Sequence, residues 1–140
     1  MTYSKEMILQ QCNAHCKNTL METLEIEFID CTEDSLTARM PVTAKVHQPD
    51  GLLHGGASVT LAESVGSAAA VIFMDVESVN IRGIEITANY VKGVRDGFVF
   101  ATATILHIGK KTQLWQVRIV NERDELVSLV KLTTISLPKK

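Results

Sequence analysis

The feature that most constrains this chain is a long apolar run that begins at a His-Gly-Gly turn. The segment "HGGASVTLAESVGSAAAVIFM" occupies positions 54–74 and carries one acidic residue, Glu63, among small and apolar neighbours. A helix that is apolar nearly all round lies in a protein core or in a membrane. The polar side chains of Glu63, Ser64 and Ser67 disfavour a membrane span, so the run predicts a buried core helix over 55–74.

Strand patterns on both sides of this helix predict a sheet that curls around it. Alternating apolar residues indicate strands at 25–31, 36–40, 79–91, 98–104, 114–120 and 126–137, after short helices at 4–12 and 19–24. Short turns between successive strands favour antiparallel pairing. We therefore expect one α+β domain over 1–140. Because one helix cannot close a six-stranded sheet, exposed strand edges remain, and edge-to-edge dimerisation would cover them.

The composition narrows the classes of partner and compartment. The chain has 46% hydrophobic residues and a net charge of −2, which gives no footprint for nucleic acid or an anionic membrane. Its three cysteines, Cys12, Cys16 and Cys31, are an odd number, and no secretory leader is recognisable, which favours a reducing cytoplasm. Cys12, His15 and Cys16 lie too close together for a zinc site without a second half elsewhere, so ordinary thiols are the favoured interpretation.

Four segments carry a resemblance to a known family. They are "HQPDGLLHGGASVTLAESVGS" (47–67), "GIEITANY" (83–90), "LHIGKKTQLWQVRI" (106–119) and "LTTISL" (132–137). They resemble the hotdog-fold acyl-CoA thioesterases, in particular the 1,4-dihydroxy-2-naphthoyl-CoA hydrolases of menaquinone synthesis and the proofreading thioesterases of enterobactin synthesis. The resemblance implies a curled antiparallel sheet wrapped around a central helix. Two positions depart from the family pattern: Asp50 stands where an aromatic residue is common, and Tyr90 where a histidine is common.

Glu63 is the first candidate for chemistry. No basic residue of its own helix can pair with it, and burying a carboxylate without a partner costs several kcal/mol. A carboxylate retained there suits attack on a thioester carbonyl or the activation of water, and the sequence leaves both roles open. Ser67 lies one helical turn later on the same face. It could hold the water or orient the carboxylate, or it could only permit close packing.

The start of the helix suits an oxygen that gains negative charge. Gly55 offers a first-turn N–H and close backbone approach, although a glycine there could also serve only the turn. The resemblance implies that His54 hydrogen-bonds near the thioester and that Gln48 positions the carbonyl or the water. Glu63 lies roughly 12 Å along the helix from Gly55. We therefore expect a shared site, with Glu63 and Ser67 from one protomer and the other three residues from its partner.

Further residues are candidates for binding coenzyme A. A basic cluster is expected for its phosphates, although ordinary solvated turns also contain lysines. The resemblance implies that backbone at 83–84 follows the pantetheine arm. The candidates for substrate and coenzyme A binding are Gly83, Ile84, Tyr90, Lys92, Arg95, Lys110 and Lys111.

These observations predict a cytoplasmic hydrolase of acyl-CoA thioesters that prefers aromatic acyl groups such as 1,4-dihydroxy-2-naphthoyl. We expect no metal or redox cofactor, because water and a thioester suffice, and an assembly of at least two protomers, arranged as a dimer of dimers. A housekeeping thioesterase that clears misloaded coenzyme A or carrier-protein thioesters is the alternative within the class. A hotdog hydratase and a non-catalytic acyl-CoA-binding module are alternatives outside it.

Overall fold

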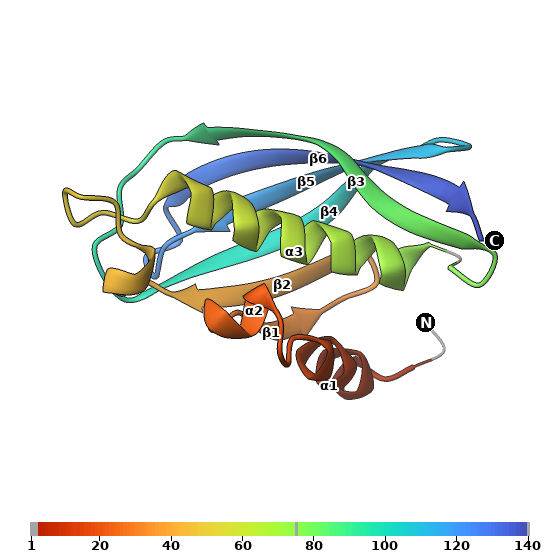
Figure 1. Ribbon diagram of the computed structural model, residues 1–140, viewed down its shortest axis with the longest axis horizontal. Coiled ribbons are helices and arrows are strands. Elements are labelled where there is room, and N and C mark those ends of the chain that lie inside the picture. The colour runs from red at the N-terminus through yellow and green to blue at the C-terminus, as the bar shows by residue number, and fades with distance from the viewer. Residues whose placement is uncertain (1–2, 75, 140) are drawn as a thin grey trace.

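The computed structural model describes residues 3–74 and 76–139. Its element order is two short helices, two strands, one long helix and four strands, as predicted (Figure 1). The elements are α1 (Lys5–His15), α2 (Leu20–Thr23), β1 (Glu27–Cys31), β2 (Ser35–Pro41), the 3-10 turn η1 (Ala44–Val46), α3 (Gly55–Phe73), β3 (Val79–Tyr90), β4 (Phe98–Ile108), β5 (Thr112–Val120) and β6 (Leu126–Pro138).

The six strands form one antiparallel sheet in the order β1-β2-β4-β5-β6-β3. Figure 1 shows α3 lying along this sheet, with β3 at one edge and β1 at the other, and with α1 and α2 near the β1 edge. Inward residues alternate with outward ones, and Leu36, Ala38 and Met40 of β2 are fully buried. The architecture is the hotdog fold, a curled antiparallel sheet around one central helix.

The helix α3 is covered on one side only. Leu61, Ala62 and Val65 pack into the core, but Glu63 is exposed in the protomer. The expectation of a helix buried all round is therefore wrong, because a single curled sheet covers one face of a helix. By length and composition alone this helix could also cross a membrane. Its inner face instead packs against the sheet, and its outer face is left for the N-terminal helices and for any docking partner.

The edge strand β3 contains a bulge that the sequence pattern did not predict. The pairing of β3 with β6 shifts between Gly83 and Glu85, so Ile84 is an extra residue and its side chain is 55% exposed. An inserted residue moves the following side chains to the opposite face. The predicted stripe of alternating apolar residues is therefore interrupted at Ile84, whereas Ile86 and Ala88 pack against the core.

A buried hydrogen-bonded network joins β5 to β6. Trp115 is fully buried, and its Nε1 donates to Oγ1 of Thr134 at 3.0 Å. Thr134 Oγ1 in turn donates to Oε1 of Gln113 at 2.6 Å, and Gln113 Nε2 donates to Oγ of Ser136 at 2.9 Å. Trp115 is therefore a core residue that also satisfies buried polar groups.

Replacing Trp115 by phenylalanine should lower the free energy of unfolding by about 2 kcal/mol. The change leaves a cavity where the indole was and removes the donor that Thr134 accepts from. Urea unfolding at one fixed protein concentration measures the effect as a lower midpoint at unchanged slope. A midpoint equal to that of the wild type would show that the network does not hold β5 to β6.

Candidate active site

The first turn of α3 leaves one backbone amide free. His54 caps the helix: its Nδ1 accepts from the N–H of Gly56 at 2.8 Å, which places the ring proton on Nε2. Its carbonyl oxygen accepts from the N–H groups of Ala57 and Ser58 at 3.0 and 3.2 Å. Within the described residues, the N–H of Gly55 has no acceptor. Of the two glycines that open the helix, Gly55 is therefore the one able to donate to a substrate oxygen.

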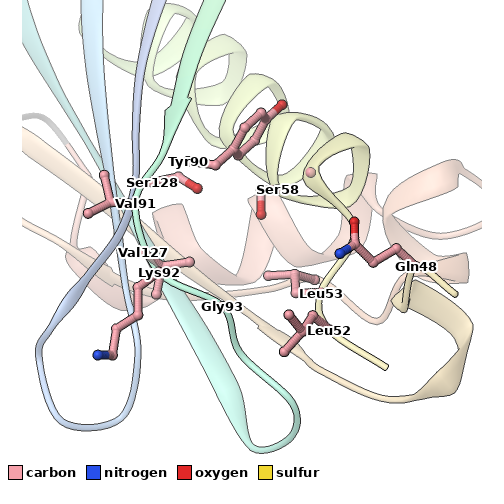
Figure 2. Close-up of a pocket in the computed structure, with 11 residues that line it drawn as sticks. Gln48, Leu52, Leu53, Ser58, Tyr90, Val91, Lys92, Gly93, Val127 and Ser128 are labelled. Atoms are coloured by element: carbon pink, nitrogen blue, oxygen red, sulfur yellow. The ribbon is translucent and has the colours of Figure 1, made fainter. Parts of the chain in front are cut away.

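A cavity of about 360 Å³ lies at this helix start, and we name it the helix-start cavity. Its lining residues come from the loop before α3, the first turns of α3, the end of β3 and the start of β6; they are Gln48, Leu52, Leu53, Gly55, Ser58, Tyr90, Val91, Lys92, Gly93, Val127 and Ser128. Figure 2 shows Tyr90 reaching from β3 towards α3, above the hydroxyl of Ser58. A Cβ added to Gly55 would lie 2.8 Å from Cζ of Tyr90, so the ring packs directly on the glycine.

Asp50, one of the departures from the family pattern, holds Gln48 in this cavity. Its Oδ1 accepts from Nε2 of Gln48 at 2.8 Å and from the N–H of Leu52 at 3.3 Å. One hydrogen of the Gln48 amide nitrogen is therefore occupied, and its other hydrogen and its amide oxygen remain for a ligand. This arrangement lets Gln48 hold a water or donate to a substrate carbonyl.

A second and larger cavity, of about 830 Å³, lies beside the middle of α3; we name it the Glu63 cavity. It runs between the outer face of α3 and the N-terminal helices and is lined by Tyr3, Ile8, Gln11, Cys12, His15, Leu20, Met21, Phe28, Thr60, Glu63, Ser64, Ser67, Ala68, Val71, Ile72 and Val76. Throughout the described ranges, Glu63 makes no ion pair. Because Glu63 is exposed in the isolated protomer, its carboxylate carries no burial cost there, but it still faces this mostly apolar cavity.

The three hydroxyls of α3 in the Glu63 cavity differ in their availability. Thr60 Oγ1 donates to the carbonyl oxygen of Gly56 at 2.9 Å, and Ser64 Oγ donates to that of Thr60 at 2.7 Å. Both are therefore committed to the helix backbone. Ser67 lies one turn beyond Glu63 on the same face and lines the same cavity, as its spacing predicted.

The N-terminal wall of this cavity is fastened to the edge of the sheet. The side chain of Asn13 on α1 accepts from the N–H of Phe28 at 2.8 Å and donates to its carbonyl oxygen at 3.0 Å. The amide thus pairs with β1 as a neighbouring strand would. This contact places Cys12, His15 and Phe28 opposite Glu63, a role for the N-terminal segment that the sequence pattern did not reveal.

Cys12 and His15 raise the possibility of a thiol nucleophile in the Glu63 cavity. Burial, together with the nearby thiols of Cys31 and Cys16, raises the pKa of Cys12 to about 11. At neutral pH only about one molecule in ten thousand would then carry the thiolate that attacks a carbonyl. Cys12 is therefore a wall of the cavity and not its nucleophile. No group of three or more metal-ligating side chains occurs among the residues described.

The candidate catalytic residues fall into two groups within one protomer. Gln48 and Gly55 line the helix-start cavity, with His54 capping the helix beside them. Glu63 and Ser67 line the Glu63 cavity, about 12 Å along the helix. The protomer thus keeps the free N–H and the free carboxylate in different cavities.

The edge strand β3 touches both groups. A Cβ added to Gly83 would lie 3.1 Å from Oε2 of Glu63, so the carboxylate rests against the glycine where the bulge begins. Seven residues further on, Tyr90 packs on Gly55. Gly83 therefore lies beside Glu63, and Tyr90 lies beside Gly55, whereas the side chain of Ile84 points outward.

The basic candidates do not gather in one patch of the protomer. Lys92 pairs with Glu125 at 3.5 Å, and Figure 2 shows its side chain directed away from Gln48 and Tyr90. The Arg95 guanidinium lies against Gly51, near the helix-start cavity. Lys110 and Lys111 occupy the β4–β5 turn at the opposite end of β4 (Figure 1).

Comparison with known proteins assigns the chain to a family. A family model described as the thioesterase superfamily matches residues 50–128. The chain belongs to the thioesterase superfamily. Its reaction class is therefore thioester hydrolysis. The matched segment of this thioesterase contains Gly55, Glu63, Ser67, Gly83 and Tyr90.

Relatives of this thioesterase are similar along nearly their whole length. The 1,4-dihydroxy-2-naphthoyl-CoA hydrolase of Escherichia coli is 39% identical over 137 residues, which cover 98% of this chain and 100% of that protein. A proofreading thioesterase of Cronobacter turicensis is 37% identical over 134 residues, which cover 96% and 97%.

Solved structures share the fold of this thioesterase. A thioesterase variant from Pseudomonas aeruginosa has a TM-score of 0.93 at 39% identity, covering 99% of this chain and 97% of that chain. A thioesterase variant from Staphylococcus aureus has a TM-score of 0.81 at 36% identity, covering 85% and 98%.

Replacing Gly83 by alanine should lower kcat several-fold with little loss of stability. The new methyl group would meet Oε2 of Glu63 at 3.1 Å and Cδ1 of Leu132 at 3.4 Å, so the carboxylate must move by a few tenths of an ångström. Small displacements of reacting groups reduce turnover strongly. Steady-state kinetics measures the effect, and the Glu63→Gln background provides the control, because the methyl group should have no further effect there. An equal loss in both backgrounds would contradict contact with Glu63 as the cause.

Proposed function

We propose that this thioesterase hydrolyses acyl-CoA thioesters with aromatic acyl groups, with 1,4-dihydroxy-2-naphthoyl-CoA as the favoured substrate. The observation that carries the proposal is the carboxylate of Glu63, which has no ion pair among residues 3–74 and 76–139 and faces a mostly apolar cavity of about 830 Å³. A non-catalytic acyl-CoA-binding module has no need of such a group. A hydratase would instead need a histidine and a carboxylate placed together to remove a proton from carbon. Here His15 lies on α1, across the cavity from Glu63 on α3.

The chemistry needs only water and the thioester. The carbonyl oxygen accepts from the N–H of Gly55 while Glu63 either attacks the carbonyl carbon or removes a proton from the attacking water. The carbon–sulfur bond then breaks and the thiolate of coenzyme A leaves. Where Glu63 is the nucleophile, water then hydrolyses the anhydride between Glu63 and the acyl group; where water attacked, the acid forms directly. Ser67 and the free amide oxygen of Gln48 hold or orient the water. We propose no metal or redox cofactor for this reaction.

The Glu63 cavity suits an aromatic acyl group. Its volume lies within the range of ligand pockets, roughly 300–1,000 Å³. Apolar side chains from Met21, Phe28 and Ile72 offer surface for a ring system, and Gln11 and His15 offer hydrogen bonds to ring hydroxyls. A long saturated chain would leave these polar groups without partners.

We propose that the complete site forms between two protomers. The outer edge of β3 has no neighbouring strand in the described protomer, and Ile84, Tyr90 and Val91 are exposed along it at 55%, 58% and 61%. If two β3 edges pair antiparallel about a two-fold axis between Ile86 and Thr87, Gly83 of one lies opposite Tyr90 of the other. Glu63, which rests on Gly83, then approaches the partner's Gly55. An assembly of two such dimers is part of the proposal.

Two variants of the Staphylococcus aureus thioesterase support the pairing of Gln48 with Glu63. Their crystal structures carry alanine in place of a glutamine and of a glutamate. The two altered positions are separated by the same number of residues as Gln48 and Glu63 here. A glutamine and a glutamate at the same spacing in both proteins support a single site that contains both side chains.

A housekeeping role is the second candidate function. A volume of about 830 Å³ in open contact with solvent can accept acyl groups of several shapes, and one relative is named a proofreading thioesterase. Comparable turnover of many coenzyme A and carrier-protein thioesters would favour this role. A marked preference for one aromatic acyl group would favour the first.

Binding of coenzyme A phosphates is assigned to Lys92 and Arg95 near the helix-start cavity, with Lys110 and Lys111 at the far turn as further candidates. Backbone at Gly83 and Ile84 is assigned to the pantetheine arm. In this proposal the protein acts in the cytoplasm, as one domain over 1–140, without nucleic acid or membrane as a partner.

A thioester panel tests the proposed function. The protein is incubated with benzoyl-CoA, 1-hydroxy-2-naphthoyl-CoA and palmitoyl-CoA, and thiol release is followed with a colorimetric reagent. We expect thiol release to be faster from the two aromatic thioesters than from palmitoyl-CoA. Release from none of them would overturn the assignment to acyl-CoA, and faster release from palmitoyl-CoA would overturn the aromatic preference.

A further inference from the structure

The start of α3 provides fewer donors than an oxyanion site normally uses. Acyl-transfer enzymes usually direct two or more hydrogen-bond donors at the oxygen that becomes negative. Here the caps by His54 occupy the N–H groups of Gly56, Ala57 and Ser58, and only that of Gly55 is free. One free amide is half of such a site, so a second donor must come from a side chain. The donors at this helix start are the second amide hydrogen of Gln48, the Nε2–H of His54 and the hydroxyl of Tyr90.

Apart from the chain neighbours of Gly55, Tyr90 is the residue that packs closest on this glycine. Its Cζ, Cε1 and hydroxyl oxygen would lie 2.8, 3.0 and 3.2 Å from a Cβ on Gly55, which places the phenol end of the ring at the glycine. The hydroxyl makes no hydrogen bond to any side chain or backbone group that the structure describes. The side chain is 58% exposed, so a substrate can reach it.

The other hydroxyls of the helix-start cavity are poorly placed for this role. Ser58 and Ser128 are 2% and 1% exposed, so they lie deeper than the half-exposed Tyr90, and Figure 2 draws Ser58 below the ring of Tyr90. A thioester entering from solvent meets Tyr90 and Gly55 before it meets either serine. Tyr90 also comes from β3, so its position is set by a different element from that of Gly55.

We propose that the hydroxyl of Tyr90 is the second donor to the thioester oxygen, next to the N–H of Gly55. This inference rests on the proposed thioester hydrolysis. As the nucleophile bonds to the carbonyl carbon, the electron pair of the C=O bond moves to oxygen, and both donors stabilise the charge. When the carbonyl re-forms, the carbon–sulfur bond breaks and the thiolate leaves. The phenol keeps its proton throughout.

Replacing Tyr90 by phenylalanine isolates the hydroxyl. The ring contact with Gly55 stays, so we expect kcat to fall by about 10- to 100-fold while KM changes by less than about threefold. The control is Thr102→Val, which removes a hydroxyl that bonds only to Thr37 at 2.9 Å, away from both cavities. An unchanged kcat in Tyr90→Phe, with wild-type stability, would overturn the proposal.

Fluorinated tyrosine tests the hydroxyl through the pH dependence of the rate, which a packing role of the ring would not change. The chain has two tyrosines, so in a Tyr3→Phe background every incorporated 3,5-difluorotyrosine lies at position 90. Fluorination makes a phenol more acidic, and a phenolate cannot donate a hydrogen bond. We expect the rate to fall at a lower pH in the fluorinated protein than in the same background with ordinary tyrosine. Identical pH–rate profiles would overturn the proposal.

The two failures are distinguishable. If the wild type releases no thiol from any thioester, the proposed function is wrong. If the wild type is active and Tyr90→Phe matches it in kcat and in pH profile, only the role of Tyr90 is wrong.

Discussion

Replacing Glu63 by glutamine is expected to lower kcat for thioester hydrolysis by about a thousandfold or more and to leave the fold intact. An amide has nearly the same shape as a carboxylate but neither attacks a carbonyl nor accepts a proton from water. Because Glu63 is exposed and makes no ion pair within the described residues, its charge contributes little to stability. The loss should therefore appear in turnover and not in folding.

Single-turnover and steady-state kinetics with an aromatic acyl-CoA measure this effect, and thermal unfolding checks the fold. The matched control is Glu33→Gln, which makes the same change at an exposed turn far from both cavities. It should keep wild-type kcat. Wild-type turnover in Glu63→Gln would remove the carboxylate from the mechanism and would leave the Glu63 cavity as a binding surface only.

Replacing Gly55 by proline is expected to lower kcat by about a hundredfold or more. Proline is tolerated at the first position of a helix, where it removes the N–H without breaking later hydrogen bonds. The free amide of Gly55 is lost, and the pyrrolidine ring also displaces Tyr90, which lies 2.8 Å from the position of a Cβ. Both proposed donors to the thioester oxygen are then removed. Unchanged turnover would contradict a role for the helix start.

Mixing the two inactive variants tests whether the site is shared. In a heterodimer of Glu63→Gln and Gly55→Pro protomers, one site carries both changes and the other carries neither. With random exchange, half of the dimers are hybrids, so about a quarter of wild-type activity should return. Native mass spectrometry confirms the exchange. Hybrids that form but remain inactive would mean that Glu63 and Gly55 of one protomer act together.

Much of the fold could be predicted because local patterns and the global fold agree. Alternation on β2 located its buried face at Leu36, Ala38 and Met40, and a continuous apolar run located α3. The bulge at Ile84 was not predictable, because an alternating pattern does not indicate where a pairing register shifts.

The candidate site was predicted in part. The spacing of Glu63 and Ser67 placed both on one helix face, and both line one cavity. The N-terminal wall was missed, since Cys12, His15 and Phe28 reach the cavity only through the contact between Asn13 and the edge of β1. The only early signal was an apolar residue every fourth position on α1, which does not say what that face contacts.

The sequence by itself determined which residues are able to do the chemistry and where each lies along its own element. Helix periodicity is local, so it separates Glu63 from Gly55 by two turns whatever surrounds them. Only the tertiary structure decided which donors are free, because the His54 cap consumes the neighbouring amides and leaves that of Gly55. It also decided that Glu63 is exposed and rests on Gly83, since burial depends on contacts between residues far apart in the chain.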